Sequence, residues 1–142
     1  MSMALEAREA YRAMTAFDRS IDFDSDLREL IKIRSSQING CAYCIDMHTY
    51  EARQAGESDR RMHAVAARRE SPLFSARERA ALALTDAITR ISETGVPDDI
   101  YNVAAGQFTK SELAQLVMTI VAINAWNRIA ITTGGSYDPP EP

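Results

Sequence analysis

The sequence predicts an all-α fold, and three observations lead to this expectation. Apolar residues recur at helical spacing along nearly the whole chain. No segment shows the period-two alternation of β-branched residues that is typical of strands. Helix start and stop signals agree with the helical period. A chain of 142 residues can bury a core without metal or cross-links. We therefore expect one domain over 1–142, a bundle of about six to seven helices.

Short connections separate the expected helices. They span roughly 5–17, 26–38, 41–55, 59–69, 76–91, 98–105 and 110–131. The second begins near Asp26, whose side chain can accept a hydrogen bond from the first turn. The Glu29 side chain can in turn accept one from the backbone N–H of Asp26, which completes a capping box. It ends at Asn39-Gly40, because both residues tolerate the left-handed conformation that terminates helices. Gly56 ends the third helix, and Ser58 can cap the fourth.

Capping boxes introduce two of the later helices. They are formed by Ser75 with Glu78 and by Thr109 with Glu112. The turn Gly95-Val96-Pro97 precedes the short sixth helix, and Gly134-Gly135 ends the last one. The Pro-rich end of the chain, about 137–142, is expected to be a flexible tail.

The last helix contains LAQLVMTIVAINAWNRIAI, which approaches the length of a membrane span. Its polar side chains would be costly in lipid, and no aromatic or basic anchors flank it. These side chains are Gln115, Asn124, Asn127 and Arg128. We expect no membrane contact but a buried central helix, partly covered by a second subunit, with Trp126 in the core or at that interface.

Charge and the N-terminal residues narrow the class of protein. The net charge of -4 argues against nucleic acid as a partner, because phosphate binding depends on clustered Lys and Arg. The first residues, MSMALEAREAYRAM, lack the apolar run of a signal peptide, so we expect a cytoplasmic protein. In a reducing cytosol, a CxxC pair favours catalysis or metal binding over a permanent disulfide.

The stretch NGCAYCIDMH holds both cysteines of the chain and one of its two histidines. Cys41, Cys44 and His48 are spaced i, i+3 and i+7, which places them within about a 60° arc of one helix face. The first turn of a helix stabilises a thiolate, and His48 can accept the proton of Cys44. Glu29, on the preceding helix, is the candidate that orients His48.

Other interpretations of these residues stay open. Glu29 can simply complete the capping box with Asp26. A structural zinc site would use Cys41, Cys44 and His48, with His63 as the fourth ligand only if the fold brings it back. His63 has no cysteines on its own helix face, so His63 and the arginines of RRMHAVAARRE are expected to be solvated. A redox-sensing module that oxidises the CxxC pair without turnover is a further alternative.

The segment from Glu29 to His48, ELIKIRSSQINGCAYCIDMH, resembles the core motif of the alkylhydroperoxidase D and carboxymuconolactone decarboxylase family, in its redox-active CxxCxxxH branch. ESPLFSARERAALALTDAIT and INAWNRI extend the resemblance over most of the chain. It implies an all-α bundle that assembles into trimers or hexamers and reduces hydroperoxides without a bound cofactor. The cysteine pair argues against lactone decarboxylation, since that branch typically lacks it.

The resemblance also implies a role for each site residue. Cys44 would attack the peroxide, Cys41 would close the disulfide, and His48 with Glu29 would relay protons. A dithiol donor, in the characterised branch a lipoyl-bearing acyltransferase, would then restore both thiols. Alkylhydroperoxidase D carries histidine where this chain has Tyr43. A phenol is no base at neutral pH, so Tyr43 is expected to donate a hydrogen bond or to pack beside the helix.

Overall fold

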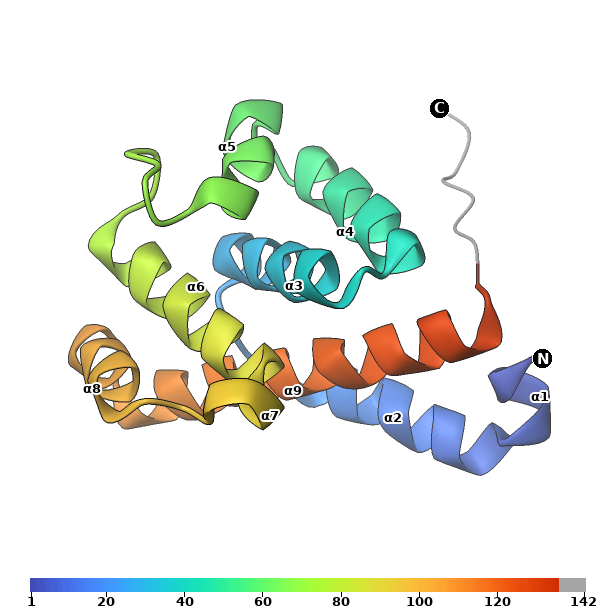
Figure 1. Cartoon of the computed structure of the whole chain (residues 1–142). Helices are drawn as coiled ribbons and strands as arrows, with labels where there is room; N and C mark the ends of the chain where they lie inside the picture. Colours follow the sequence, from blue (N-terminus) through green and yellow to red (C-terminus); the bar gives the residue numbers. More distant parts are fainter. Residues whose placement is uncertain (136–142) are drawn as a thin grey trace.

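A computed structural model describes residues 1–135, and this part of the chain contains helices and no strand (Figure 1). The predicted all-α class is therefore confirmed. The helices are α1 Met3–Glu6, α2 Arg8–Ser20, α3 Ser25–Asn39, α4 Ala42–Gln54, α5 Asp59–Ala64, α6 Ala76–Thr89, α7 Ile91–Thr94, α8 Asp98–Gln107 and α9 Lys110–Thr133, with a 3-10 turn at Val65–Ala67. The described residues thus hold more helices than predicted, because α1 and α7 are extra four-residue segments. The predicted tail over 137–142 lies outside the described residues.

Helix α3 is the centre of the bundle, and α4, α6 and α9 pack around it (Figure 1). The helices meet through apolar side chains at helical spacing, which removes that apolar surface from water. The most deeply buried of them include Leu30, Ile31, Ile33, Leu82, Leu84, Leu116 and Ile120. A residue on α3 is therefore held by neighbours on several sides.

The helix boundaries follow the predicted capping signals with one exception. Both capping boxes are present, Ser75 with Glu78 and Thr109 with Glu112. The prediction that Asp26 caps α3 and pairs with Glu29 is wrong. The cap is Asp24, whose Oδ1 accepts from the backbone N–H groups of Asp26 and Leu27 at 3.1 and 3.2 Å. Glu29 then lies beyond the first turn and is available for another contact.

The predicted first helix is interrupted at Ala7, where φ is -127° and ψ is 48°. This break separates α1 from α2 and turns the N-terminal residues back toward the end of α9 (Figure 1). No Gly or Pro signals the break in the sequence. Met1, Met3 and Ala4 instead line a cavity in the folded chain, so the break accompanies a tertiary contact.

The expectation that the arginines of RRMHAVAARRE are solvated is wrong for Arg68. This side chain is buried and donates to Asp86 Oδ2 at 2.8 Å. Arg34 donates to both carboxylate oxygens of Asp86 at 2.6 and 3.0 Å. A guanidinium matches a carboxylate in this forked geometry. Asp86 on α6 therefore ties α3 to the segment that follows α5.

Helix α9 is long and apolar enough to cross a membrane by length and composition alone. Its polar residues, however, form hydrogen bonds inside the bundle. Asn39 donates to the side-chain oxygens of Asn124 and Asn127 at 3.0 and 2.8 Å, and Asn124 donates to Thr89 on α6 at 3.0 Å. Buried amides paired in this way are typical of a core helix. They fix the end of α3 to α9.

Replacing Asp86 with Asn tests the buried ion pairs. The change leaves the Arg34 and Arg68 guanidinium groups without their carboxylate, and breaking a buried pair typically costs about 3–5 kcal/mol. We expect urea unfolding to report a loss of this order at about pH 7. The control is Asp59→Asn, because Asp59 and its partner Arg53 are exposed and such pairs contribute about 1 kcal/mol or less. Equal losses in the two variants would contradict the assignment.

The stabilisation by Asp86 should also depend on pH. Burial alone would raise the pKa of Asp86, but the hydrogen bonds from Arg34 and Arg68 outweigh it and hold the pKa below the ordinary 3.8. A carboxylate with a depressed pKa contributes fully above its ordinary pKa and loses that contribution as the pH falls below it. The difference in unfolding free energy between wild type and Asp86→Asn should narrow below about pH 4.

Candidate functional site

The site begins at the turn between α3 and α4. Gly40 has φ 71°, the left-handed conformation, and the backbone N–H of Cys41 donates to the carbonyl of Ser36 at 2.9 Å. Cys41 is the N-cap of α4, where its sulfur accepts from the backbone N–H of Cys44 at 3.3 Å. Both cysteines therefore lie at the positive end of the helix dipole, which stabilises thiolates.

Cys41 and Cys44 form a disulfide, and their Cα atoms are 5.3 Å apart. Each residue is only 1% exposed. The pair packs against Ile123 of α9, with Tyr43 and Trp126 at the margin of the same cluster. The two cysteines are thus enclosed by protein, and a reaction partner must reach them through an opening in the fold.

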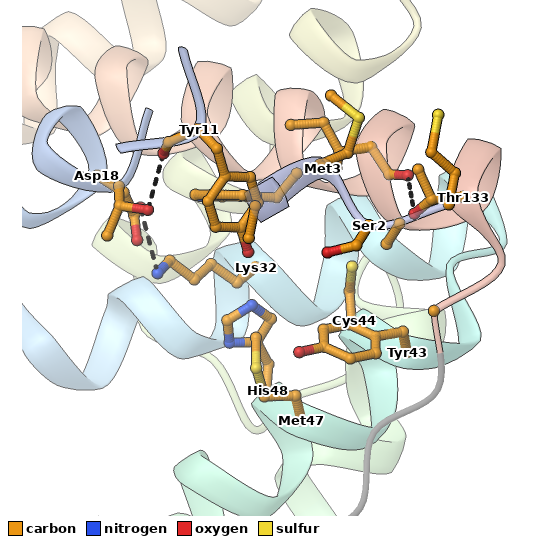
Figure 2. Close-up of a pocket in the computed structure, with 17 residues that line it drawn as sticks. Ser2, Met3, Tyr11, Asp18, Lys32, Tyr43, Cys44, Met47, His48 and Thr133 are labelled. Atoms are coloured by element: carbon orange, nitrogen blue, oxygen red, sulfur yellow. Dashed lines mark hydrogen bonds and ion pairs between the residues drawn. The ribbon is translucent and has the colours of Figure 1, made fainter. Parts of the chain in front are cut away.

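A cavity of about 430 Å³ provides that opening (Figure 2). Cys44 and His48 lie in its wall, whereas Cys41 is not among the lining residues. Tyr43 and Trp126 also line it, so Trp126, which was predicted to lie in the core or at a subunit interface, belongs to the cavity wall. The rings of Trp126 and Tyr11 of α2 form an edge-to-face pair with their centroids 5.4 Å apart. Its wall combines apolar side chains, such as Met47 and Ile129, with polar ones, such as Lys32.

His48 is the buried imidazole of this wall. Its Nδ1 atom lies 3.0 Å from Glu29 Oε2 and 3.1 Å from Glu51 Oε2. Because carboxylates accept, Nδ1 carries the proton and Nε2 is left as the basic nitrogen. The structure therefore brings together the predicted residues Glu29, His48 and Cys44. Glu51 was not predicted, although its spacing of three residues from His48 places it on the same helix face.

The electrostatics of His48 reflect these contacts. Burial lowers the pKa of His48, but the hydrogen bonds to Glu29 and Glu51 outweigh it and raise the pKa above the ordinary 6.5. The bond to His48 in turn lowers the pKa of Glu51. A raised pKa makes the neutral imidazole a stronger base toward a thiol and stabilises the imidazolium that later returns the proton.

Lys32 is a cationic side chain close to His48, and it was not among the site residues predicted from the sequence. Its side chain is 10% exposed, and its Nζ lies 3.6 Å from Asp18 Oδ1 of α2. Figure 2 shows the Lys32 side chain reaching past His48 toward Asp18 and Tyr11. Its positive charge opposes protonation of His48 and so acts to lower the His48 pKa. The sequence signal for Lys32 was its spacing of three residues from Glu29, which places both side chains on one face of α3.

Within residues 1–135, the three side chains placed closely enough to share a metal ion are Glu29, His48 and Glu51. One imidazole nitrogen and two carboxylate oxygens suit a first-row divalent metal ion. This set differs from the predicted zinc ligands, because it includes neither Cys41 nor Cys44. The two carboxylates already share the Nδ1–H group of His48 as a hydrogen-bond donor. His63, the possible fourth zinc ligand, is an exposed residue of α5.

Comparisons with known proteins identify the family and the fold. A family model for the carboxymuconolactone decarboxylase family matches residues 6–87. The uncharacterized protein YdfG of Bacillus subtilis is 40% identical over 132 residues, which cover 93% of this chain and 90% of YdfG. The fold is also that of an uncharacterized peroxidase-related protein from Silicibacter sp. TM1040, with a TM-score of 0.78, 24% identity, and coverage of 89% of this chain and 69% of that one.

A crystal structure from Agrobacterium tumefaciens is similar over nearly the whole length. Its TM-score is 0.90 at 37% identity, and the match covers 99% of this chain and 98% of that one. The function of that protein is unknown, and a role as an antioxidant defence protein, AhpD, has been suggested for it. With the CxxCxxxH motif and the fold both in place, the chain belongs to the carboxymuconolactone decarboxylase family, in its alkylhydroperoxidase D-like branch.

Proposed function

We propose that the chain is a thiol-dependent peroxidase that reduces hydroperoxides with Cys41 and Cys44. The observation that carries the proposal is that Cys44 and His48 line one cavity while Glu29 holds Nδ1 of His48. A nucleophile, a base and a group that orients the base form the arrangement that activates a thiol. Membership of the family and the similarity to the Agrobacterium protein with a suggested antioxidant role support the proposal.

The first step takes place at Cys44. His48 accepts the thiol proton, and the thiolate attacks the outer oxygen of the hydroperoxide. An S–O bond forms, the O–O bond breaks, and the electron pair of the broken bond stays on the departing alkoxide. His48 returns the proton to this alkoxide, which leaves as an alcohol. The sulfur is oxidised to a sulfenic acid, and the peroxide is reduced by the same two electrons.

Cys41 completes the reaction. Its sulfur attacks the Cys44 sulfenic acid, an S–S bond forms, and water leaves with the proton of the Cys41 thiol. We assign this resolving role to Cys41 because it caps α4 beside Cys44 but does not line the cavity. Tyr43 lines the cavity next to Cys44, and we propose that its hydroxyl donates a hydrogen bond to the peroxide.

A dithiol must then reduce the disulfide by exchange. Because Cys41 and Cys44 are each 1% exposed, a slender donor such as a dihydrolipoyl arm fits the site better than a globular thiol protein. We propose a lipoyl-bearing protein as the reductant and the reducing cytoplasm as the location. The burial also suits the alternative of a redox-sensing module, since a buried disulfide that meets no donor persists.

We also propose that the protein is a homo-oligomer, a trimer or a hexamer. Helix α9 leaves Met118 and Val121 exposed by 42% and 44%, one turn apart on the same face. Val103 and Leu5 add further exposed apolar surface. Exposed apolar side chains that share one helix face of a small protein, as Met118 and Val121 do, are typical of a subunit interface, and the occupant proposed here is a second copy of the chain.

The cysteine roles predict distinct outcomes for two variants. Reduced, chelator-treated wild type should consume cumene hydroperoxide continuously with dihydrolipoamide as donor, and Cys44→Ser should lose this activity entirely. Cys41→Ser should react once and retain one added oxygen atom on Cys44, which intact mass will detect. Full activity in Cys44→Ser contradicts the assignment. Wild-type oxidation that stops after one equivalent with every dithiol tested favours the sensor, and stoichiometric zinc before chelation favours a metal site.

The carboxylates beside His48 should set its pKa. Glu29→Gln removes a hydrogen bond and a negative charge that both raise this pKa, so NMR titration of the oxidised protein should show a lower His48 pKa. Glu51→Gln should shift it in the same direction. The signal of His63 on the surface is the control and should be the same in all variants. His48→Gln should slow oxidation of Cys44 by roughly 10²–10⁴-fold, the usual contribution of a positioned base.

The proposed interface predicts a large assembly. At micromolar concentration, light scattering after gel filtration should give a mass several times the 15.7 kDa of one chain. Val121→Glu places a charge in the apolar face of α9 and should shift the assembly toward monomer. Lys110→Glu, at the exposed start of the same helix, is the matched control. A monomeric wild type would refute this interface.

A further inference from the structure

Lys32 is a cation enclosed in the wall of the cavity. Its side chain is 10% exposed, and its ammonium forms an ion pair with Asp18 at 3.6 Å, which is longer than a hydrogen bond. Within residues 1–135 the structure records no hydrogen bond from this ammonium. An ammonium has three N–H donors, and this nitrogen is not among the fully enclosed polar atoms, so its donors can be reached from the cavity that Lys32 lines. The arrangement leaves donors available to a ligand in the cavity.

The charge around Cys44 makes this cation significant. The carboxylates of Glu29 and Glu51 contact Nδ1 of His48, and that of Asp18 pairs with Lys32. Lys32 is the only Lys or Arg among the described residues that line the cavity. Attack by a thiolate moves negative charge onto the departing oxygen of the peroxide. A fixed positive charge aimed at that oxygen stabilises the transition state more than the reactants.

We propose that Lys32 is a catalytic residue that binds the hydroperoxide oxygens and stabilises the departing alkoxide, with Asp18 holding it in position. The inference rests on the peroxidase activity proposed above. The atoms and electrons of the step are unchanged, because His48 supplies the proton and Lys32 supplies only charge and hydrogen bonds. The ligand class is therefore a hydroperoxide whose oxygens reach both Cys44 and Lys32, while its organic group contacts the apolar wall.

Two other roles for Lys32 make different predictions. If the ion pair only fastens α2 to α3, Asp18→Asn should do the same damage as Lys32→Met. If Lys32 only promotes ionisation of Cys44, its loss should lower the fraction of thiolate but leave the reactivity of each thiolate unchanged. A role at the departing oxygen lowers the reactivity of the thiolate itself.

The first step can be isolated in a Cys41→Ser background, where Cys44 is the only thiol. Trp126, the single tryptophan, lines the same cavity as Cys44, so we expect its fluorescence to follow the oxidation of Cys44 in stopped flow. Thiolate absorbance against pH gives the ionised fraction, so the rate with cumene hydroperoxide can be expressed per thiolate. The chain has two lysines, and Lys110→Met at the exposed start of α9 is the matched control.

We expect Lys32→Met to reduce the rate per thiolate by roughly 10²–10³-fold, the usual cost of removing a donor that stabilises a developing oxyanion. Lys32→Arg should recover most of the rate because it keeps the charge. Asp18→Asn should lose far less than Lys32→Met, and Lys110→Met should match the parent. Thermal melts and circular dichroism will identify a variant that fails to fold, in which case Lys32→Arg against Lys32→Gln provides the comparison.

The outcomes separate this inference from the proposed function. A parent protein that reacts with the peroxide and a Lys32→Met variant that reacts equally fast per thiolate would overturn the role of Lys32 and leave the peroxidase intact. Equal losses in Asp18→Asn and Lys32→Met would also overturn it, in favour of a structural ion pair. A parent that reacts with no hydroperoxide overturns the proposed function and this inference together.

Discussion

The turn at Gly40 is the constraint on which the site depends. Only Gly40 and Cys41 separate α3 from α4, and Gly40 adopts the left-handed conformation that lets the chain reverse. Asn39 fixes the same point to α9 through its hydrogen bonds with Asn124 and Asn127. Because both ends of this short connection are held, the register of α4 against α3 is determined. That register places Glu29 opposite His48 and Cys41 at the start of a helix.

Local sequence signals predicted much of this arrangement. The capping boxes at Ser75 and Thr109 depend on residues three positions apart, so they can be identified without knowledge of the fold. The same holds for the helical spacing of Cys44 and His48 and for the stop at Gly40. The cap at Asp24 was missed because several acidic residues there compete for one role, and only the backbone geometry decides among them.

Contacts between distant segments were not predictable in this way. The burial of Arg68 depends on Asp86 and Arg34, which lie on other helices. Likewise, the importance of Lys32 follows from a cavity formed by α2, α3, α4 and α9 together with the N-terminal residues. A single sequence records the residue types but not which of them converge. Tertiary geometry was therefore needed to separate a solvated charge from one held inside the protein.

The burial of the two cysteines affects how their oxidation state is determined. Each is 1% exposed, and exchange requires a thiolate to reach a sulfur directly. A thiol that cannot enter the cavity cannot equilibrate with the pair, however favourable its reduction potential. The disulfide is therefore insulated kinetically from thiols that are too bulky to enter the cavity. The ratio of disulfide to dithiol then depends on the rates at which oxidants and donors enter the cavity. It does not depend directly on the redox potential of the compartment.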